Sequence, residues 1–234
     1  MRLDKFISSC TGLTRSQATK VIRQGRVGVN GEPCKQGATQ LKADATITLD
    51  DEPLALSGPR YLVLHKPAGY VCSSDDPEHP TVMMLLDEPA LESLNPVGRL
   101  DLDTTGLLLI TDDGQWLHRI TSPKHHVAKT YRVWLADPIP ADAAAQFAEG
   151  VLLRGEKDPT LPAELEVIAE REALLTIHEG RYHQVKRMFA ALGNKVVRLH
   201  REKIGDFQLP EDLSEGDYRL LTEQEKYQLQ TVQK

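Results

Sequence analysis

The chain of 234 residues has only three cysteines, Cys10, Cys34 and Cys72, and they are widely spaced. Because no Cys-x-x-Cys pair occurs, the sequence supports neither a disulfide framework nor a structural zinc site. The adjacent histidines His125 and His126 cannot readily bind one ion together, and no thiol or carboxylate lies at ligand spacing from them. We therefore expect free thiols and no bound metal.

Long apolar runs are also absent, and the longest ones, such as Leu107–Ile110, are far too short to cross a bilayer. Residues 1–6 carry charges where a signal peptide needs a continuous apolar core. The sequence contains no Gly-x-x-x-x-Gly-Lys-Ser/Thr phosphate loop and no Gly-x-Ser-x-Gly elbow. These absences predict a cytoplasmic protein without a membrane partner, and they give no support to nucleotide hydrolysis or serine-esterase chemistry.

Acidic residues outnumber basic ones by 34 to 28, and the net charge of -6 taken alone argues against a nucleic-acid partner. The basic residues are nevertheless clustered. Residues 14–26 contain Arg15, Lys20, Arg23 and Arg26 and no acidic residue, and residues 181–203 contain seven basic residues against Glu202 alone. One such run is usually a solvated helix face, but two separate runs indicate a polarised RNA-binding surface.

The N-terminal part is predicted to be a compact module of two helices and two strands. Apolar spacing over residues 3–7 predicts a short helix, and Thr14 with Gln17 forms a capping box for a second one. Alternation over residues 27–29, followed by an Asn-Gly turn, and again over residues 45–49 predicts two strands. This order resembles the S4-like RNA-binding domain, in which basic helices lead into a Val-x-Val-Asn-Gly hairpin.

Residues 50–59 are predicted to be a linker, because two prolines and a glycine interrupt any periodic pattern. We place the boundary near Ser57, which gives domains of residues 1–57 and 58–234. Beyond it, strands are predicted at residues 61–64, 106–110, 131–135, 163–168 and 174–177, and helices at residues 111–120, 141–149 and 181–192. Because strands outnumber helices and do not alternate regularly with them, the pattern favours an α+β fold over a doubly wound parallel sheet.

The densest candidate site is the segment Gly98–Gly106, which contains Arg99, Asp101 and Asp103. One interpretation is a polar turn that enters a buried strand. A second is the nucleophile loop of a magnesium-dependent phosphatase, because Asp-x-Asp-x-Thr matches it, although no apolar strand precedes the motif here. A third makes Asp101 a cofactor-free catalyst on a nucleoside, with a nearby cation that keeps it ionised. The residues alone leave all three open.

The segment after Gly180 predicts a helix with two faces. Val185, Met188 and Phe189 have the spacing of a buried stripe, and Lys186 and Arg187 project from its margins. Taken alone, this segment is most simply a basic surface helix.

Three segments together resemble the RsuA/RluB/E/F-type pseudouridine synthases. They are Gly-Arg-Leu-Asp-x-x-Thr-x-Gly-Leu at residues 98–107, Lys-Thr-Tyr at 129–131, and Gly-Arg-x-His-Gln-Val-Lys-Arg-Met at 180–188. An S4-like N-terminal domain is the usual companion in that family. The resemblance implies a small S4-like domain, then a larger mixed, mainly antiparallel-sheet domain that isomerises uridine to pseudouridine without a cofactor.

The resemblance also implies roles for single residues. Asp101 would be the catalytic aspartate, Tyr131 would stack on the uracil, and Lys186 would pair with Asp101. Arg99 would organise the RNA around an extruded nucleotide. Further RNA contacts are expected from Arg15, Lys20, Arg23, Arg26, Lys129, Arg181, His183, Gln184 and Arg187. Without the resemblance, Tyr131 would more simply be a core residue of its strand.

Residues 64–73, 75–82 and 111–116 are most similar to the small-subunit branch of the family. They imply a monomeric enzyme whose partner is 16S rRNA or a small-subunit assembly intermediate, with U516 as the modified uridine. Three alternatives stay open: a large-subunit rRNA synthase of the same family, a non-catalytic RNA-binding assembly factor, and the magnesium-dependent phosphatase.

Overall fold

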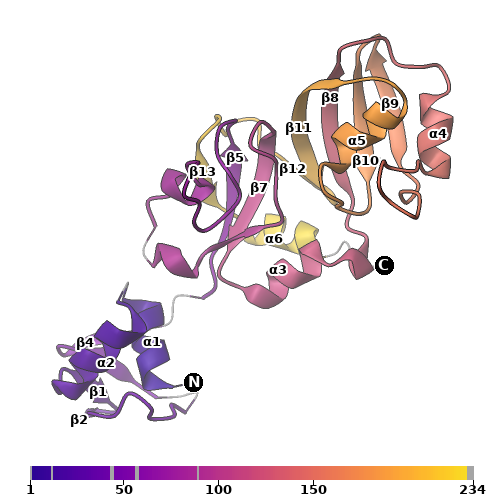
Figure 1. Ribbon diagram of the computed structural model, residues 1–234. Coiled ribbons are helices and arrows are strands. Elements are labelled where there is room, and N and C mark those ends of the chain that lie inside the picture. The colour runs from indigo at the N-terminus through magenta and orange to yellow at the C-terminus, as the bar shows by residue number, and fades with distance from the viewer. Residues whose placement is uncertain (1, 12, 43–44, 56–57, 89, 231–234) are drawn as a thin grey trace. The chain divides into compact units, whose positions relative to one another are not determined.

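The computed structural model describes residues 2–11, 13–42, 45–55, 58–88 and 90–230. The chain divides into two compact units, Met1–Arg60 with Leu86–Leu94 and Tyr61–Leu85 with Asn95–Lys234 (Figure 1). The boundary expected at Ser57 lies outside the described residues.

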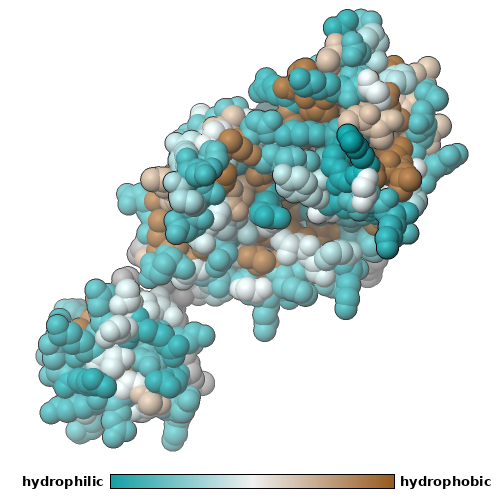
Figure 2. Space-filling view, in the orientation of Figure 1, coloured by the Kyte–Doolittle hydropathy of each residue, from teal (hydrophilic) through white to brown (hydrophobic). Residues whose placement is uncertain are grey.

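The first unit contains the predicted helices, α1 (Leu3–Cys10) and α2 (Arg15–Arg23), and a four-stranded antiparallel sheet. The order β2-β1-β3-β4 comprises β2 (Glu32–Pro33), β1 (Val27–Val29), β3 (Ile47–Leu49) and β4 (Glu52–Leu54). The capping box is present, since the Thr14 hydroxyl accepts from Gln17 N–H and the Gln17 side chain accepts from Thr14 N–H at 2.8 Å. The helices bury an apolar stripe against β1 and β3, and the unit's surface in Figure 2 is mostly hydrophilic.

The interpretation of residues 50–59 as a linker is wrong for Glu52–Leu54, because these residues form β4 and pair with β3. Asp50 and Asp51 both adopt positive φ and make the tight turn between the two strands. Pro53 is tolerated because β4 is an edge strand. A proline there lacks a backbone N–H, but among the described residues no further strand lies on the outer side of β4 to need that hydrogen bond. The proline therefore marks a sheet edge here.

The second unit is built on a nine-stranded sheet whose main path runs β13-β5-β7-β11-β8-β10-β9. These strands are β13 (Tyr218–Leu220), β5 (Tyr61–Lys66), β7 (Thr105–Thr111), β11 (Val196–Ile204), β8 (Lys129–Leu135), β10 (Glu172–Ile177) and β9 (Glu164–Ala169), with β6 (Asn95–Val97) on β7 and β12 (Phe207–Gln208) on β11. Among the strand pairings of this sheet in the described residues, that of β7 with β11 is parallel and the others are antiparallel. The α+β class is confirmed.

Two apolar cores flank this sheet. One joins β5 and β7 to α3 (Gly114–Thr121) and α6 (Glu223–Gln230), and the other joins β8 and β10 to α4 (Ala143–Glu149) and α5 (Gln184–Ala191). Short 3-10 helices lie at η1 (Val82–Leu85), η2 (Leu91–Ser93) and η3 (Pro123–His125). Among the described residues no helix is both long and apolar enough to span a membrane.

Three predicted helices begin two or three residues later than expected, and α4 is one of them, because it begins at Ala143 and not at residue 141. The Asp113 side chain accepts from Gln115 N–H and Trp116 N–H, so α3 begins after this cap and not at Thr111. His183 has a left-handed φ of 47°, so α5 begins at Gln184. Its predicted buried stripe is confirmed, since Val185, Met188 and Phe189 are all buried.

Candidate active site

A cavity of about 590 Å³ lies between the two cores of the second unit. Its lining draws on all three segments of the predicted site, including Arg99 and Asp101, Lys129 and Tyr131, and residues 180–185. The volume is typical of a site that encloses one small ligand. The fold thus brings together segments that are more than 80 residues apart in the chain, as the contact between Lys186 and Asp103 shows.

Asp101 lies at this cavity in a cationic setting. Its Oδ2 is 2.9 Å from Lys186 Nζ, and its Oδ1 is 3.4 Å from His183 Nε2. Asp103 shares the same lysine, with Oδ1 2.6 Å from Nζ. The two carboxylates differ in exposure, because the Asp101 side chain is 25% exposed and lines the cavity, whereas that of Asp103 is 71% exposed and does not. Of these two carboxylates, Asp101 is therefore the one that can reach a molecule bound in the cavity.

Lys186 comes from the first turn of α5, whose apolar stripe fixes the helix against β8 and β10. Burial alone would lower the pKa of Lys186, but its hydrogen bonds to Asp103 and Asp101 outweigh burial and raise the pKa. The side chain is therefore a stable ammonium ion that pairs with both carboxylates and offsets part of their negative charge.

The backbone around Asp101 is held by Lys66, which has no exposed surface. Lys66 Nζ donates to the carbonyl oxygens of Asp101 at 3.1 Å, Thr104 at 2.8 Å and Pro67 at 3.0 Å. Burial lowers the pKa of this lysine. No role was predicted for Lys66, although it lies in residues 64–73, one of the segments that resemble the small-subunit branch of the family.

Tyr131 is buried in β8 on the same strand face as Val133, and it also lines the cavity. It is both a core residue and a wall of the site. Its hydroxyl lies 3.5 Å from Nη1 of Arg201, a residue that is only 2% exposed. Arg201 Nε donates to the Leu107 carbonyl at 2.8 Å, and its buried Nη2 has no hydrogen-bond partner among the described residues. In the sequence, Arg201 is one of the seven basic residues of the run 181–203, and nothing nearby marks it as buried.

Lys129 lines the cavity, and its Nζ donates to the Val127 carbonyl at 2.9 Å. Burial, together with repulsion from Arg201, lowers the pKa of Lys129 to about 8. The unfolded chain keeps a lysine pKa near 10.5, so it binds more protons than the folded chain between pH 8 and 10.5.

The free energy of unfolding should therefore rise with pH across that window, by up to about 3 kcal/mol from Lys129 alone. Urea unfolding of wild type and Lys129→Met at pH 7.5 and 9.5 measures the difference. We expect wild type to gain stability relative to the variant at the higher pH. If the free energy of unfolding depended on pH in the same way in both proteins, folding would not lower the pKa of Lys129.

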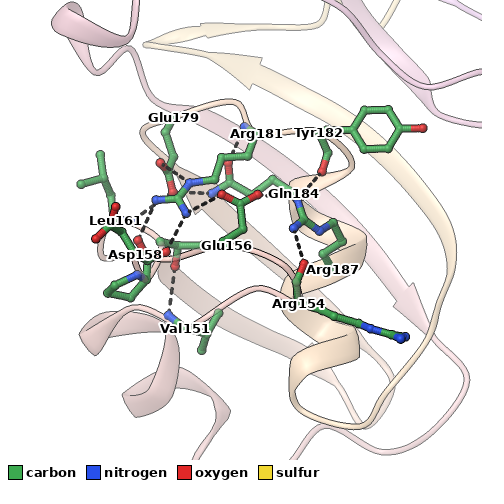
Figure 3. Close-up of polar contacts among 12 residues, drawn as sticks. Val151, Arg154, Glu156, Asp158, Leu161, Glu179, Arg181, Tyr182, Gln184 and Arg187 are labelled. Carbon is green, nitrogen blue, oxygen red and sulfur yellow. Dashed lines mark hydrogen bonds and ion pairs between the residues drawn. The ribbon is translucent and has the colours of Figure 1, made fainter.

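Three residues predicted to bind RNA form an internal polar network instead of pointing freely to solvent (Figure 3). Arg181 Nε donates to Glu179 at 3.0 Å, and its Nη atoms donate to the carbonyls of Asp158 and Pro159. Arg187 pairs with Glu156 at 2.9 Å. Gln184 bridges Arg181 N–H and Glu179. RNA contact by these three remains a prediction, and Arg99 is the exposed arginine at the cavity.

The four residues of the first unit that were predicted to bind RNA lie on the exposed side of α2 and just beyond it. Lys20 and Arg23 line a shallow groove together with Ser16, Thr19 and Gln24. Arg15 lies 3.4 Å from Asp4, and Arg26 forms a two-pronged ion pair with Asp50. Their predicted RNA contacts likewise remain predictions.

The geometry does not fit a magnesium-dependent phosphatase. The Asp-x-Asp-x-Thr segment runs into β7, whose first residue is Thr105, instead of following the apolar first strand of a parallel sheet, and the sheet is mainly antiparallel. In the described part of the chain, no group of three or more His, Cys, Asp or Glu side chains is arranged to hold a metal ion.

Comparison with known proteins matches the family model described as RNA pseudouridylate synthase over residues 60–191, which is more than half of the chain. The chain belongs to the RNA pseudouridylate synthase family. Residues 1–47 match the S4 domain, which confirms the prediction for the N-terminal part.

The chain is similar over nearly its full length to curated enzymes of this family. It is 59% identical to the ribosomal small subunit pseudouridine synthase A of Vibrio cholerae, over 96% of this chain and 97% of that protein. It is 58% identical to the protein of the same name from Escherichia coli K12, over 96% and 98%. A solved pseudouridylate synthase shares 58% identity and a TM-score of 0.72, covering 98% of this chain and 99% of that one.

Proposed function

We propose that this chain isomerises one uridine of small-subunit (16S) ribosomal RNA to pseudouridine, with U516 as the target and Asp101 as the catalytic residue. The observation that carries the proposal is the cavity in which Asp101, paired with Lys186, and Tyr131 share one lining. The names of the similar full-length enzymes support the small-subunit rRNA substrate.

The reaction needs a positioned carboxylate and a site that retains the uracil after its bond to the sugar has broken. The bond between C1′ and N1 breaks, the uracil turns, and a bond between C1′ and C5 forms. C5 then gives up its hydrogen as a proton, N1 gains a proton from solvent, and the net change is an isomerisation.

Asp101 either attacks C1′ or removes the proton from C2′ while the base is detached. The target base must leave its stack to reach this carboxylate, and an aromatic wall such as Tyr131 holds an extruded base by stacking. The reaction requires no cofactor in this scheme. We propose that the enzyme acts as a cytoplasmic monomer on free 16S rRNA or on a small-subunit assembly intermediate.

A tritium-release assay tests the proposed substrate. Transcripts of 16S and 23S rRNA carry tritium at uracil C5, and isomerisation releases it to water. In the presence of chelator we expect release from 16S rRNA or the assembling small subunit and none from 23S rRNA. Release from 23S rRNA alone would favour the large-subunit alternative, and binding without release would favour the assembly factor.

Lys186→Met should slow turnover by roughly 100-fold, because it leaves two carboxylates together without the ammonium that pairs with both of them. The affinity for RNA should change much less, by about threefold, if Lys186 serves Asp101 and not a phosphate. Single-turnover rates and filter binding separate the two effects. Equal losses in rate and affinity would reduce Lys186 to a phosphate contact.

A further inference from the structure

Tyr182 is an exposed aromatic residue at the cavity that the reaction itself does not use. Its side chain is 72% exposed, although the chain contains only six tyrosines, four phenylalanines and two tryptophans. A tyrosine ring left in water gains nothing for folding. The fold nevertheless places it on the cavity lining.

The ring of Tyr182 is stacked on that of His183, with centroids 3.8 Å apart and an angle of 20° between the planes. His183 in turn lies 3.4 Å from Asp101. The inner face of the tyrosine is therefore covered by the histidine, and the short series of contacts ends at the carboxylate. The other face of the ring remains available to a planar group.

The backbone of this pair is anchored firmly. Arg187 Nη1 donates to the Tyr182 carbonyl at 3.0 Å, and Arg187 Nη2 donates to the Arg154 carbonyl at 2.9 Å. Arg181, on the other side of Tyr182 in the chain, is held by Glu179 and by the carbonyls of residues 158 and 159. In Figure 3 the Tyr182 ring extends away from this network while both arginines point into it. Preorganisation of this kind lowers the entropy cost of binding to the ring.

We infer that Tyr182, backed by His183, is a stacking platform for the nucleobase next to the extruded uridine in the substrate RNA; the inference rests on the proposed function. Every nucleobase presents a planar π face, and base stacking on an aromatic ring is a common way to hold single-stranded RNA. The neighbouring Arg99, which is exposed and lines the same cavity, supplies a cation for the phosphate backbone of an RNA strand at this place. The Arg181 and Arg187 network would then serve RNA binding indirectly, by fixing the platform.

Short 16S rRNA fragments with an abasic residue on the 5′ or the 3′ side of the target uridine test this inference. With the intact fragment, Tyr182→Ala should weaken binding about tenfold, and Tyr182→Phe, which keeps the ring, should weaken it less than threefold. Tyr227→Ala is the matched control, because Tyr227 is a tyrosine of α6 that is 66% exposed and does not line the cavity.

The abasic fragments identify the partner base. On one of the two, the difference between wild type and Tyr182→Ala should disappear, since there is no base left to stack. If Tyr182→Ala weakened binding of both abasic fragments as much as it weakens binding of the intact fragment, the inference would be overturned. Equal binding of intact RNA by wild type and Tyr182→Ala would overturn it as well. So would a loss that appears with ribonucleoprotein particles and not with naked RNA, since the platform would then bind a protein. Absence of tritium release by wild type from any rRNA would overturn the proposed function, and this inference with it.

Discussion

Asp101→Asn should abolish isomerisation, with a fall in the single-turnover rate of about 10⁴-fold or more, while RNA affinity stays within about threefold of wild type. Asparagine keeps the shape of the side chain but can neither attack C1′ nor accept a proton from C2′, and loss of a reacting group has effects of this size. Tritium release under single-turnover conditions, with filter binding in parallel, measures both quantities.

Asp103→Asn is the matched control for this prediction. Both carboxylates contact Lys186, but only Asp101 lines the cavity. We expect the Asp103 variant to lose far less activity, because it removes one partner of the lysine and no reacting atom. If the two variants lost activity equally, the assignment of chemistry to Asp101 would fail.

Gly106→Ala should destabilise the second unit by about 3 kcal/mol or more. A Cβ on Gly106 would lie 2.3 Å from the Arg201 carbonyl oxygen and 2.7 Å from Arg201 N, and the φ of +110° is itself strained for any other residue. The collision falls on the parallel pairing of β7 with β11, where Arg201 is the partner of Gly106. No flexible side chain can move to relieve it, because the atoms that collide are backbone atoms.

Thermal unfolding measures this effect. A loss of this size should lower Tm by roughly 6 to 12 °C for a unit of this length. The control is Gly114→Ala, at the first position of α3, where no atom lies within 4 Å and alanine favours the helix. We expect that variant to be as stable as wild type or slightly more stable. A Tm of Gly106→Ala within about 2 °C of wild type would contradict the close pairing of Gly106 with Arg201.

Local signals predicted α1, α2, β1 and β3 of the first unit, because the information for these elements lies close in sequence. The capping box of Thr14 and Gln17 and the Asn-Gly turn each involve neighbouring residues, and both form as expected. The strand β11 escaped prediction because its charged residues hide the alternation, and a buried arginine, Arg201, occupies one of its core positions. A single sequence gives no sign that such an arginine is inside.

In the candidate site, too, some features were predicted from the sequence and others were not. The motif of residues 98–107 and the helix that carries Lys186 were identified from sequence, and the fold brings them together at one cavity. Arg181 and Arg187 were expected to face RNA, but their partner Glu156 is 25 or more residues away, and such ion pairs have no local signature. Lys66 escaped prediction because its role is to bind carbonyl oxygens of a loop 35 or more residues further along the chain.

Position-resolved mapping of pseudouridine in 16S rRNA tests the central claim most directly. Purified wild type and Asp101→Asn are each incubated with unmodified 16S rRNA or the assembling small subunit in the presence of chelator, and the products are mapped by mass spectrometry. We predict one pseudouridine, at U516, with wild type and none with Asp101→Asn. Pseudouridine formed equally well by the Asp101 variant, or no pseudouridine in any form of 16S rRNA with wild type, would contradict it.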